Sequence, residues 1–269
     1  MTHKQAIQRN FARRGTTYDS HARIQQWMAV ELLRGCRQAL LGARRILEVG
    51  CGTGHVTELL RRANPHATLV ALDLETSLLQ RARRRLGRDV GVQFVAADGE
   101  AYTFGSYDLI VSNSVFQWFV RPGETLQNYY RMLRPGGSLA FAILGPATFQ
   151  ELTASFQQAA GNLSLAGPPA VPAASFSGEE TWRRFLTNAG FQEVALQREV
   201  CTETYPSVQE FLHALQATGA TNPAPRPFSP RLFRRMAAIY QQAYGRNGSI
   251  PVTYEVIWAL AQKLEVMSG

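Results

Sequence analysis

The chain has 269 residues, 45% of them hydrophobic and 18% charged, which is enough for a large domain with a full buried core. It contains no apolar run of the ~20 residues that a membrane span needs, and its polar N-terminus leads us to expect no secretory leader. Its three cysteines, Cys36, Cys51 and Cys201, are too widely spaced for a disulfide framework or a zinc site, so we expect a reducing, cytoplasmic compartment and no metal.

The net charge of +8 is unevenly distributed. Residues 1–145 carry nineteen basic and eleven acidic residues, whereas residues 146–269 carry nine of each. Only Lys4 and Lys263 are lysines, so almost all of the basic residues are arginines. Such a surface attracts nucleic acid, an anionic membrane or an acidic protein, although solvated helix faces explain the same composition without any partner.

Helical and strand patterns alternate along the first 145 residues. Apolar residues at helical spacing predict helices over 5–14 and 21–41. Five strands are then predicted with helices between them; the strands are 45–49, 68–72, 92–96, 107–113 and 138–144, and the helices are 54–63, 75–86 and 125–133. This alternation predicts a mostly parallel sheet with helices on both faces, whose ligands bind beyond the carboxyl ends of the strands.

The pattern changes after Gly145. A helix over 148–160 is followed by a loop over 161–178 that is rich in Pro, Ala, Ser and Gly. A helix over 179–189, a strand over 191–200, two helical stretches within 205–248 and a strand over 252–262 complete the chain. We therefore predict a core from residues 1–147, 179–204 and 251–269, with helical cap insertions at 148–178 and 205–250.

A glycine-rich loop follows the first strand in the sequence Ile46-Leu47-Glu48-Val49-Gly50-Cys51-Gly52-Thr53-Gly54. Alternating glycines allow a sharp turn and leave no Cβ between the backbone and a ligand, and the next helix directs free N–H groups at the loop. Because the acidic residue lies inside the motif and G-x-G-x-x-G is absent, the loop resembles motif I of the class I S-adenosylmethionine (SAM) methyltransferases. This resemblance implies a Rossmann-like fold with a seven-stranded sheet.

Three acidic residues near strand ends are candidate cofactor ligands. Asp73 ends the second strand, where a carboxylate can accept the ribose hydroxyls, and Asp98 follows the third, where it suits the adenine amino group. Asp73 could instead cap the next helix, and the Asp98-Gly99 pair could simply form a turn. Glu48 is interpreted as an acceptor for the cofactor ammonium or the loop amides, or as a structural carboxylate. The complete predicted cofactor site is Glu48, Gly50, Cys51, Gly52, Gly54, Asp73, Leu74, Asp98, Gly99 and Asn113.

The end of the fourth strand reads Ser112-Asn113-Ser114-Val115-Phe116-Gln117-Trp118, at the position of motif IV. The Asn-Pro-Pro-Tyr signature of amino-group methylation and a catalytic cysteine pair are absent, which argues against base or amide methylation. Gln117 and Trp118 either line a substrate pocket or pack beneath the cap.

Over its whole length the chain resembles the malonyl-acyl-carrier-protein O-methyltransferases of biotin synthesis. The motifs that carry this resemblance are Phe11-Ala12-Arg13-Arg14, Thr17 to Gln25, the glycine loop, Ser112-Asn113 with Gln117-Trp118, Gly145 to Leu152, Gly219-Ala220-Thr221-Asn222 and Pro251 to Val256. Relatives often have smaller residues where this chain has Val115 and Phe116, so the chain departs from the family pattern at positions that bear on the width of its pocket.

The resemblance implies methyl transfer from SAM to the free carboxylate of a malonyl thioester, with S-adenosylhomocysteine as the other product. That carboxylate is already ionised at neutral pH, so no general base is expected. Tyr18 is the candidate for a positioning residue at the methyl-transfer centre, and His21, Gln25, Gln117 and Trp118 are candidate substrate residues.

Acyl carrier proteins are acidic, which gives the arginine excess a possible use. The candidate docking residues are Arg13, Arg14, Arg226, Arg231, Arg234, Arg235 and Arg246. No membrane partner is expected. Three other functions stay open: a small-acid carboxyl methyltransferase of the trans-aconitate type, an RNA methyltransferase, and a non-catalytic SAM-binding protein.

Overall fold

The computed structural model describes residues 18–88, 90–165, 167, 169–218 and 229–264. The chain forms two compact units. Among the described residues, the sheet unit comprises 22–143, 178–198 and 257–264, and the helical unit comprises 18–21, 144–177 and 199–256. The predicted helix over 5–14 and the motif at Gly219–Asn222 lie outside the described residues.

Seven strands form one sheet in the order β3-β2-β1-β4-β5-β7-β6. Their bounds are β1 Arg45–Val49, β2 Thr68–Asp73, β3 Val92–Ala96, β4 Tyr107–Asn113, β5 Leu133–Leu144, β6 Glu193–Tyr205 and β7 Ile250–Gln262. The first five strands pair in parallel. Strand β7 runs antiparallel to β5, because Gly136 N donates to Lys263 O while Gly145 N donates to Glu255 O. The strand order reverses between β1 and β4, which is where ligands bind in open α/β sheets.

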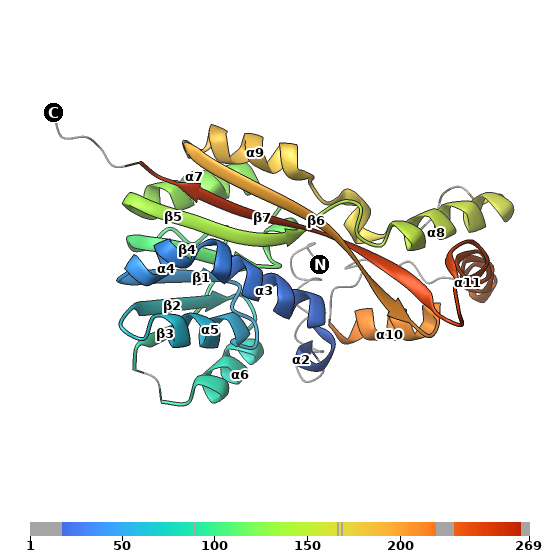
Figure 1. The fold of residues 1–269 in the computed structure, drawn as a ribbon, viewed down its shortest axis with the longest axis horizontal. Coiled ribbons are helices and arrows are strands. Elements are labelled where there is room, and N and C mark those ends of the chain that lie inside the picture. Colours follow the sequence, from blue (N-terminus) through green and yellow to red (C-terminus); the bar gives the residue numbers. More distant parts are fainter. Residues whose placement is uncertain (1–17, 89, 166, 168, 219–228, 265–269) are drawn as a thin grey trace. The chain divides into compact units, whose positions relative to one another are not determined.

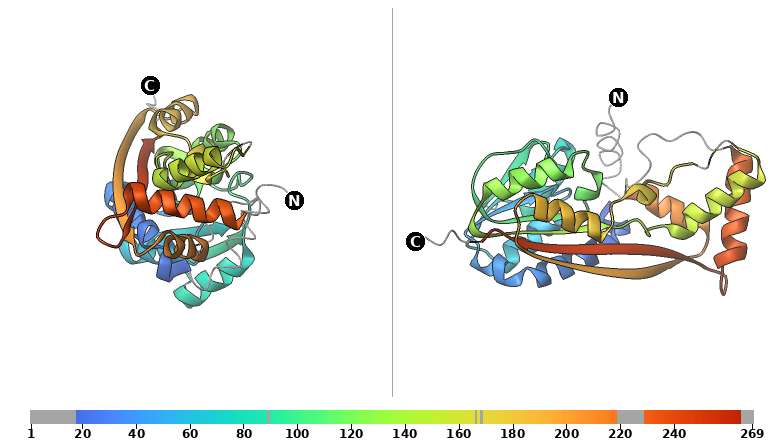
Figure 2. Two further views of the ribbon diagram at one scale, coloured as in Figure 1. Left: turned by 90° about the vertical axis from the view of Figure 1, so that its right-hand side faces the viewer. Right: turned by 90° about the horizontal axis from the view of Figure 1, so that it is seen from above.

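Two groups of helices cover the sheet within the sheet unit. One group is α3 Arg23–Gly35, α4 Arg37–Gly42, α5 His55–Ala63 and α6 Thr76–Leu86; the other is α7 Pro122–Met132 and α9 Glu179–Asn188. The two groups lie on opposite faces of the sheet (Figure 1 and Figure 2). Helix α6 buries Leu78, Leu79 and Ala82, and its last turn carries three consecutive arginines. These features confirm the predicted α/β fold with a mostly parallel seven-stranded sheet.

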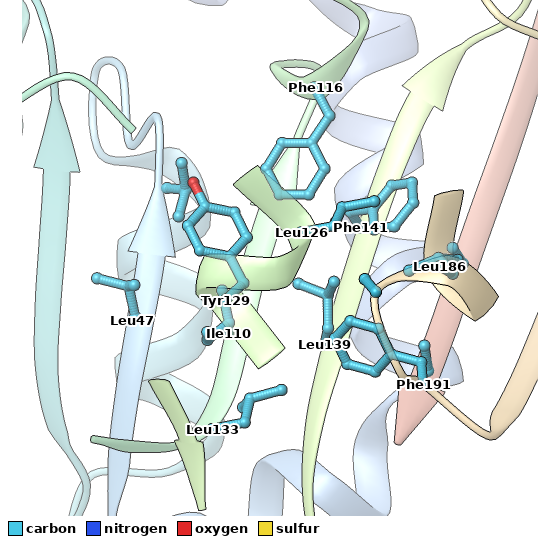
Figure 3. Packing of buried hydrophobic residues seen from close by; sticks show 14 of the residues in the cluster. Leu47, Ile110, Phe116, Leu126, Tyr129, Leu133, Leu139, Phe141, Leu186 and Phe191 are labelled. Atoms are coloured by element: carbon cyan, nitrogen blue, oxygen red, sulfur yellow. The ribbon is translucent and has the colours of Figure 1, made fainter. Parts of the chain in front are cut away.

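The main core of the sheet unit lies between the sheet and helices α7 and α9 (Figure 3). Phe116 belongs to the short 3-10 helix Phe116–Trp118 and is 1% exposed. Its ring packs against Phe119, Tyr129 and Phe141. The large residue at this position therefore fills the core, where aromatic packing adds to the stability gained from burial.

The helical unit contains α2 Tyr18–His21, α8 Gln150–Asn162, a 3-10 turn at Pro172–Ser175, α10 Val208–Ala217 and α11 Pro230–Tyr244, together with the ends of β6 and β7. Helix α8 contacts α11, and α10 contacts both α2 and α11. Helix α11 buries Leu232, Met236, Ile239 and Tyr240 on one face. Its Tyr240 hydroxyl donates to Pro251 O at 2.8 Å, which ties the helix to the beginning of β7.

Among the predicted element boundaries that differ from the structure, two differ most clearly. The helix expected over 21–41 is divided into α2, α3 and α4, with a break at Cys36. Strand β5 begins at Leu133 instead of residue 138, because the Pro135-Gly136-Gly137 segment forms an irregularity that shifts the pairing with β4 between Tyr107 and Leu109. Strands β6 and β7 each contribute residues to both units.

Within the described part of the chain, helices of the length and apolarity required to cross a membrane are not found.

Candidate cofactor and active site

The loop that follows β1 has the backbone conformation that its glycines predict. Gly50, Gly52 and Gly54 all have positive φ, at +74°, +54° and +84°. The amides of Gly50 and Cys51 both donate to Leu72 O, at 2.8 and 2.9 Å, and Gly54 N donates to Cys51 O at 2.9 Å. Side chains rarely adopt positive φ without strain, so glycine is required at each of these turns.

The three glycines differ in how much space a Cβ would have at each position. A Cβ at Gly50 would lie 2.3 Å from Val115 Cγ2, and one at Gly54 would lie 2.9 Å from Ala82 on α6. A Cβ at Gly52 would meet no atom within 4 Å. The loop is thus packed at both ends and open in the middle, beside the N-terminus of α5. This open backbone fits a nucleoside-type cofactor.

Asp73 fastens this loop to the end of β2. Its Oδ2 accepts from Gly52 N and its Oδ1 accepts from Glu75 N, both at 2.8 Å. Burial raises the pKa of the Asp73 carboxyl above its usual value, and the two amide donors oppose that rise. The cap of α6 is Glu75, whose carboxylate accepts from Ser77 N at 3.1 Å. Asp73 therefore fixes the backbone of the loop, and its predicted contact with ribose stays a prediction.

Glu48 is a buried acid at the entrance to the loop, with only 2% of its surface exposed. Burial raises its pKa to about 8; Thr57 partly opposes this rise, and the charge of Asp73 adds to it. Four amides of the loop, at residues 50, 51, 52 and 54, donate to acceptors other than Glu48. Glu48 Oε2 has no hydrogen-bond partner among the described residues. Its expected contact with the cofactor ammonium stays a prediction that this environment favours.

Asp98 and Gly99 form a turn after β3. Asp98 Oδ1 accepts from Glu100 N at 3.0 Å, and its backbone carbonyl accepts from Ala101 N and Tyr102 N. Gly99 O accepts from the Tyr129 hydroxyl at 2.8 Å. A Cβ at Gly99 would lie 2.7 Å from Val49 Cγ1, so the turn packs directly against the end of β1. The turn suggested by the Asp-Gly pair is therefore present, and the contact with adenine stays a prediction.

The end of β4 is attached to α3. Asn113 Nδ2 donates to Gln25 O at 3.0 Å, and Ser114 Oγ donates to Met28 Sδ at 3.6 Å. Ser114 has a positive φ of 60°, so the chain bends sharply before Val115. This bend places Val115 against Gly50 and buries Phe116. The predicted cofactor residue Asn113 therefore holds the backbone of the predicted substrate residue Gln25.

Gln117 and Trp118 are partly buried in the 3-10 helix that follows this bend. Gln117 Oε1 is buried and has no hydrogen-bond partner among the described residues. A buried amide oxygen of this kind is costly unless a donor reaches it. This is consistent with the substrate role predicted for Gln117, which stays a prediction, as does that of Trp118.

Other predicted residues lie in the helical unit. Tyr18 and His21 belong to the short helix α2, and the exposed His21 has its Nδ1 3.0 Å from Ser20 Oγ. Their predicted roles stay predictions. The exposed arginines of this unit lie on α11 or in the turn after it; they are Arg231, Arg234, Arg235 and Arg246. Arg13, Arg14 and Arg226 lie outside the described residues.

Two of the motifs that carried the resemblance contact each other in the helical unit. The buried Glu151 accepts from Thr253 N at 3.2 Å and also binds the Thr253 hydroxyl. Glu255 Oε2 accepts from Ala147 N at 2.6 Å. The segment after β5 is therefore fixed to β7 by two buried carboxylates, which explains why acidic residues stand in both motifs.

Arg85, on helix α6, was not among the site residues predicted from the sequence. Its Nη1 donates to the carbonyl and to the hydroxyl of Thr53, both at 3.2 Å. Among the described residues there is no group of three or more His, Cys, Asp or Glu side chains arranged to hold a metal ion.

Comparison with known proteins agrees with this geometry. Residues 47–141 match the family model described as a methyltransferase domain. The chain is 35% identical to the malonyl-[acyl-carrier protein] O-methyltransferase of Halalkalibacterium halodurans, over 96% of this chain and 98% of that protein. It is 36% identical to the enzyme of the same name from Paenibacillus sp. strain JDR-2, over 96% of this chain and 97% of that protein.

Solved structures with low sequence identity share the fold. Haemonchus contortus phosphoethanolamine N-methyltransferase 2 aligns with a TM-score of 0.55 and 17% identity, over 88% of this chain and 52% of that one. The YcgJ protein of Bacillus subtilis aligns with a TM-score of 0.56 and 14% identity, over 86% of this chain and all of that one.

A methyl group added at Gly52 tests the open loop. We expect Gly52→Ala to place its Cβ in the open space and to raise the Kd for SAM more than about tenfold. Gly248→Ala is the matched control, because Gly248 also has positive φ (+74°) and open space around its Cβ. Both variants should lose roughly 1–2 kcal/mol of stability through backbone strain. Equal SAM affinity in the two variants, by calorimetry, would contradict this account.

The raised pKa of Glu48 predicts a pH dependence of stability. Between pH 4.5, its ordinary pKa, and about 8, the folded chain holds a proton that the unfolded chain releases. The free energy of unfolding of the cofactor-free protein should therefore fall as the pH rises from 5 to 8. One fully linked proton contributes at most about 1.4 kcal/mol per pH unit.

Urea unfolding at several pH values measures this slope. Glu48→Gln should make the decline shallower than in the wild type, whereas Glu124→Gln, at an exposed acid on α7, should leave the decline unchanged. Identical slopes for Glu48→Gln and the wild type would show that this carboxyl does not hold the proton.

Proposed function

The chain belongs to the malonyl-[acyl-carrier protein] O-methyltransferase family, and from this we propose that it transfers a methyl group from SAM to the free carboxylate of malonyl-acyl-carrier protein. The product is the malonyl methyl ester, which a fatty-acid elongation system can accept for biotin synthesis. The observation that carries the proposal is the similarity to this family over 96% of the chain. The open, glycine-lined backbone at Gly52 supports it, because it fits the cofactor that such an enzyme requires.

The proposed reaction requires no general base from the protein. Bound SAM supplies an electrophilic methyl group on a positively charged sulfur. A carboxylate acceptor with a pKa of about 4 is ionised at neutral pH and needs no base to activate it. What the protein must supply is alignment and exclusion of water, which can contribute several kcal/mol, up to about 7–11 in favourable intramolecular cases.

We assign the cofactor contacts to the residues around the loop. Asp73 and the partly exposed Leu74 would hold the ribose and one face of the adenine, and Asp98 would bind the adenine amino group. The loop glycines would allow close approach of the backbone, and Glu48 would accept from the ammonium of the methionine part. A cation beside Glu48 favours its ionised form, so binding of the cofactor would lower the raised pKa of this carboxyl.

From the resemblance to this family we assign roles in acceptor binding to Tyr18, His21, Gln25, Gln117 and Trp118. Tyr18 would position the acceptor carboxylate. The side-chain amide of Gln117, whose buried Oε1 has no hydrogen-bond partner among the described residues, would bind the substrate. Val115, which packs on Gly50, would limit the width of this site.

We assign recognition of the acidic carrier protein to the arginines of the helical unit. Helix α11 contains no acidic residue, and Arg231 and Arg234 are exposed beside its buried apolar positions. With the Asn162 amide oxygen turned toward it, Arg235 Nη2 donates to that oxygen at 3.1 Å, so this arginine also links α11 to α8. Arg246 extends the basic surface beyond α11. We expect the reaction to take place in the cytoplasm, without a membrane partner.

The function is tested directly by offering several acceptors. The purified protein is incubated with SAM and, separately, with malonyl-acyl-carrier protein, malonyl-coenzyme A, trans-aconitate or RNA, and mass spectrometry records which acceptor gains a methyl group. We expect malonyl-acyl-carrier protein to gain it fastest. Methylation of trans-aconitate alone, or of RNA alone, would replace the proposal with that activity, and binding of SAM with no methyl transfer would indicate a non-catalytic protein.

Charge reversal tests the docking surface. Arg231→Glu combined with Arg234→Glu should slow methylation of malonyl-acyl-carrier protein about tenfold or more, because it removes attraction to an acidic partner. The rate of methylation of malonyl-coenzyme A should change less than twofold. The control combines Arg37→Glu with Arg84→Glu, two exposed arginines of the sheet unit, on α4 and α6. Equal losses on both substrates, or the same selective loss in the control, would exclude α11 as the docking surface.

A further inference from the structure

Arg85 contacts the middle of the glycine loop from outside. Its guanidinium Nη1 donates at 3.2 Å to the carbonyl oxygen of Thr53 and at 3.2 Å to the Thr53 hydroxyl. Thr53 stands between two glycines with positive φ, Gly52 and Gly54. From these contacts we propose that Arg85 is a positioning residue for the cofactor: it fixes the loop in the conformation that receives SAM without contacting SAM itself.

The contact is part of a face of α6 that packs on the loop. A Cβ added at Gly54 would lie 2.9 Å from Ala82 Cβ and 3.3 Å from Leu86 Cδ2. Ala82, Arg85 and Leu86 are spaced by three and four residues, so they lie on the same side of the helix. The close approach of Ala82 to the glycine brings the helix near enough for Arg85 to reach Thr53.

The β2–α6 segment therefore holds two successive residues of the loop. Asp73, at the end of β2, accepts from Gly52 N, and Arg85, in the last turn of α6, donates to Thr53. Glycine-rich backbone has many accessible conformations when it is not held. A loop fixed before binding loses less entropy when the ligand arrives, and this raises affinity.

Glu58 forms an ion pair with the same guanidinium. Arg85 Nε lies 3.7 Å from Glu58 Oε2, and Arg62 Nη2 donates to Glu58 Oε1 at 2.5 Å. Glu58 lies in the first turns of α5, the helix that begins directly after the loop. Arg85 is thus oriented by α5 while it binds the loop, and its side chain is only 26% exposed, in contrast to 73% for Arg62.

The test compares SAM affinity with stability in four variants, and it rests on SAM being the cofactor. Arg85→Gln removes both donations to Thr53, and we expect about a tenfold rise in the Kd and KM for SAM with kcat at saturating SAM changed less than twofold. Arg85→Lys keeps a charged donor and should recover part of the affinity. Glu58→Gln leaves the Thr53 contacts in place and should raise the Kd less than about threefold.

Arg84→Gln is the matched control, because it removes the same charge from the neighbouring exposed position of α6. It should bind SAM as the wild type does. The melting temperature is measured without SAM for every variant, so that a general loss of stability is separated from a loss of affinity.

Two results would overturn the inference while leaving the proposed function intact. In the first, Arg85→Gln binds SAM as tightly as the wild type while its melting temperature falls, which would make Arg85 merely structural. In the second, Arg84→Gln weakens binding as much as Arg85→Gln, which would make the effect one of bulk charge. A wild-type protein that does not bind SAM at all would refute the proposed function and this inference with it.

Discussion

The site depends on one constraint, the backbone between β1 and α5, where three glycines with positive φ alternate with Cys51 and Thr53. Its ends are packed, Gly50 by Val115 and Gly54 by Ala82, whereas Gly52 faces open space. Two other elements hold it there. The end of β2 holds the loop through Leu72 and Asp73. Helix α6 holds it through Arg85, which Glu58 of α5 orients. The open space at Gly52 therefore depends both on the glycines of the loop and on the residues of β2 and α6 that hold it.

The electrostatics of this region suit a cationic ligand. Glu48 and Asp73 are both held in surroundings that raise the pKa of their carboxyls, and the charge of Asp73 contributes to the raised pKa of Glu48. Ionising both without a counter-charge is unfavourable, and a ligand that carries an ammonium and a sulfonium relieves this cost. The proposed acceptor is an anion that needs no base, so the proposed reaction requires placement more than proton transfer.

Most of the fold could be predicted from the alternation of strands and helices. The bounds of β3 and β4 were predicted as they occur, because turn residues flank both strands. Strand β5 was predicted to begin too late, because Pro135-Gly136-Gly137 is typical of a break and the sheet accommodates it as a shift in register. Arg85 could not be found from the pattern of α6, because its contact with Thr53 depends on how closely Ala82 approaches Gly54.

The central claim is that the loop around Gly52 is where SAM binds. Hydrogen exchange measured by mass spectrometry, with and without saturating SAM, tests this most directly. The account predicts slower exchange of amides in residues 50–54 and at residues 73–75 and 98–100, with no comparable change in α11. Unchanged exchange in residues 50–54 at a SAM concentration that gives a saturable binding heat would contradict it, because the cofactor would then bind elsewhere.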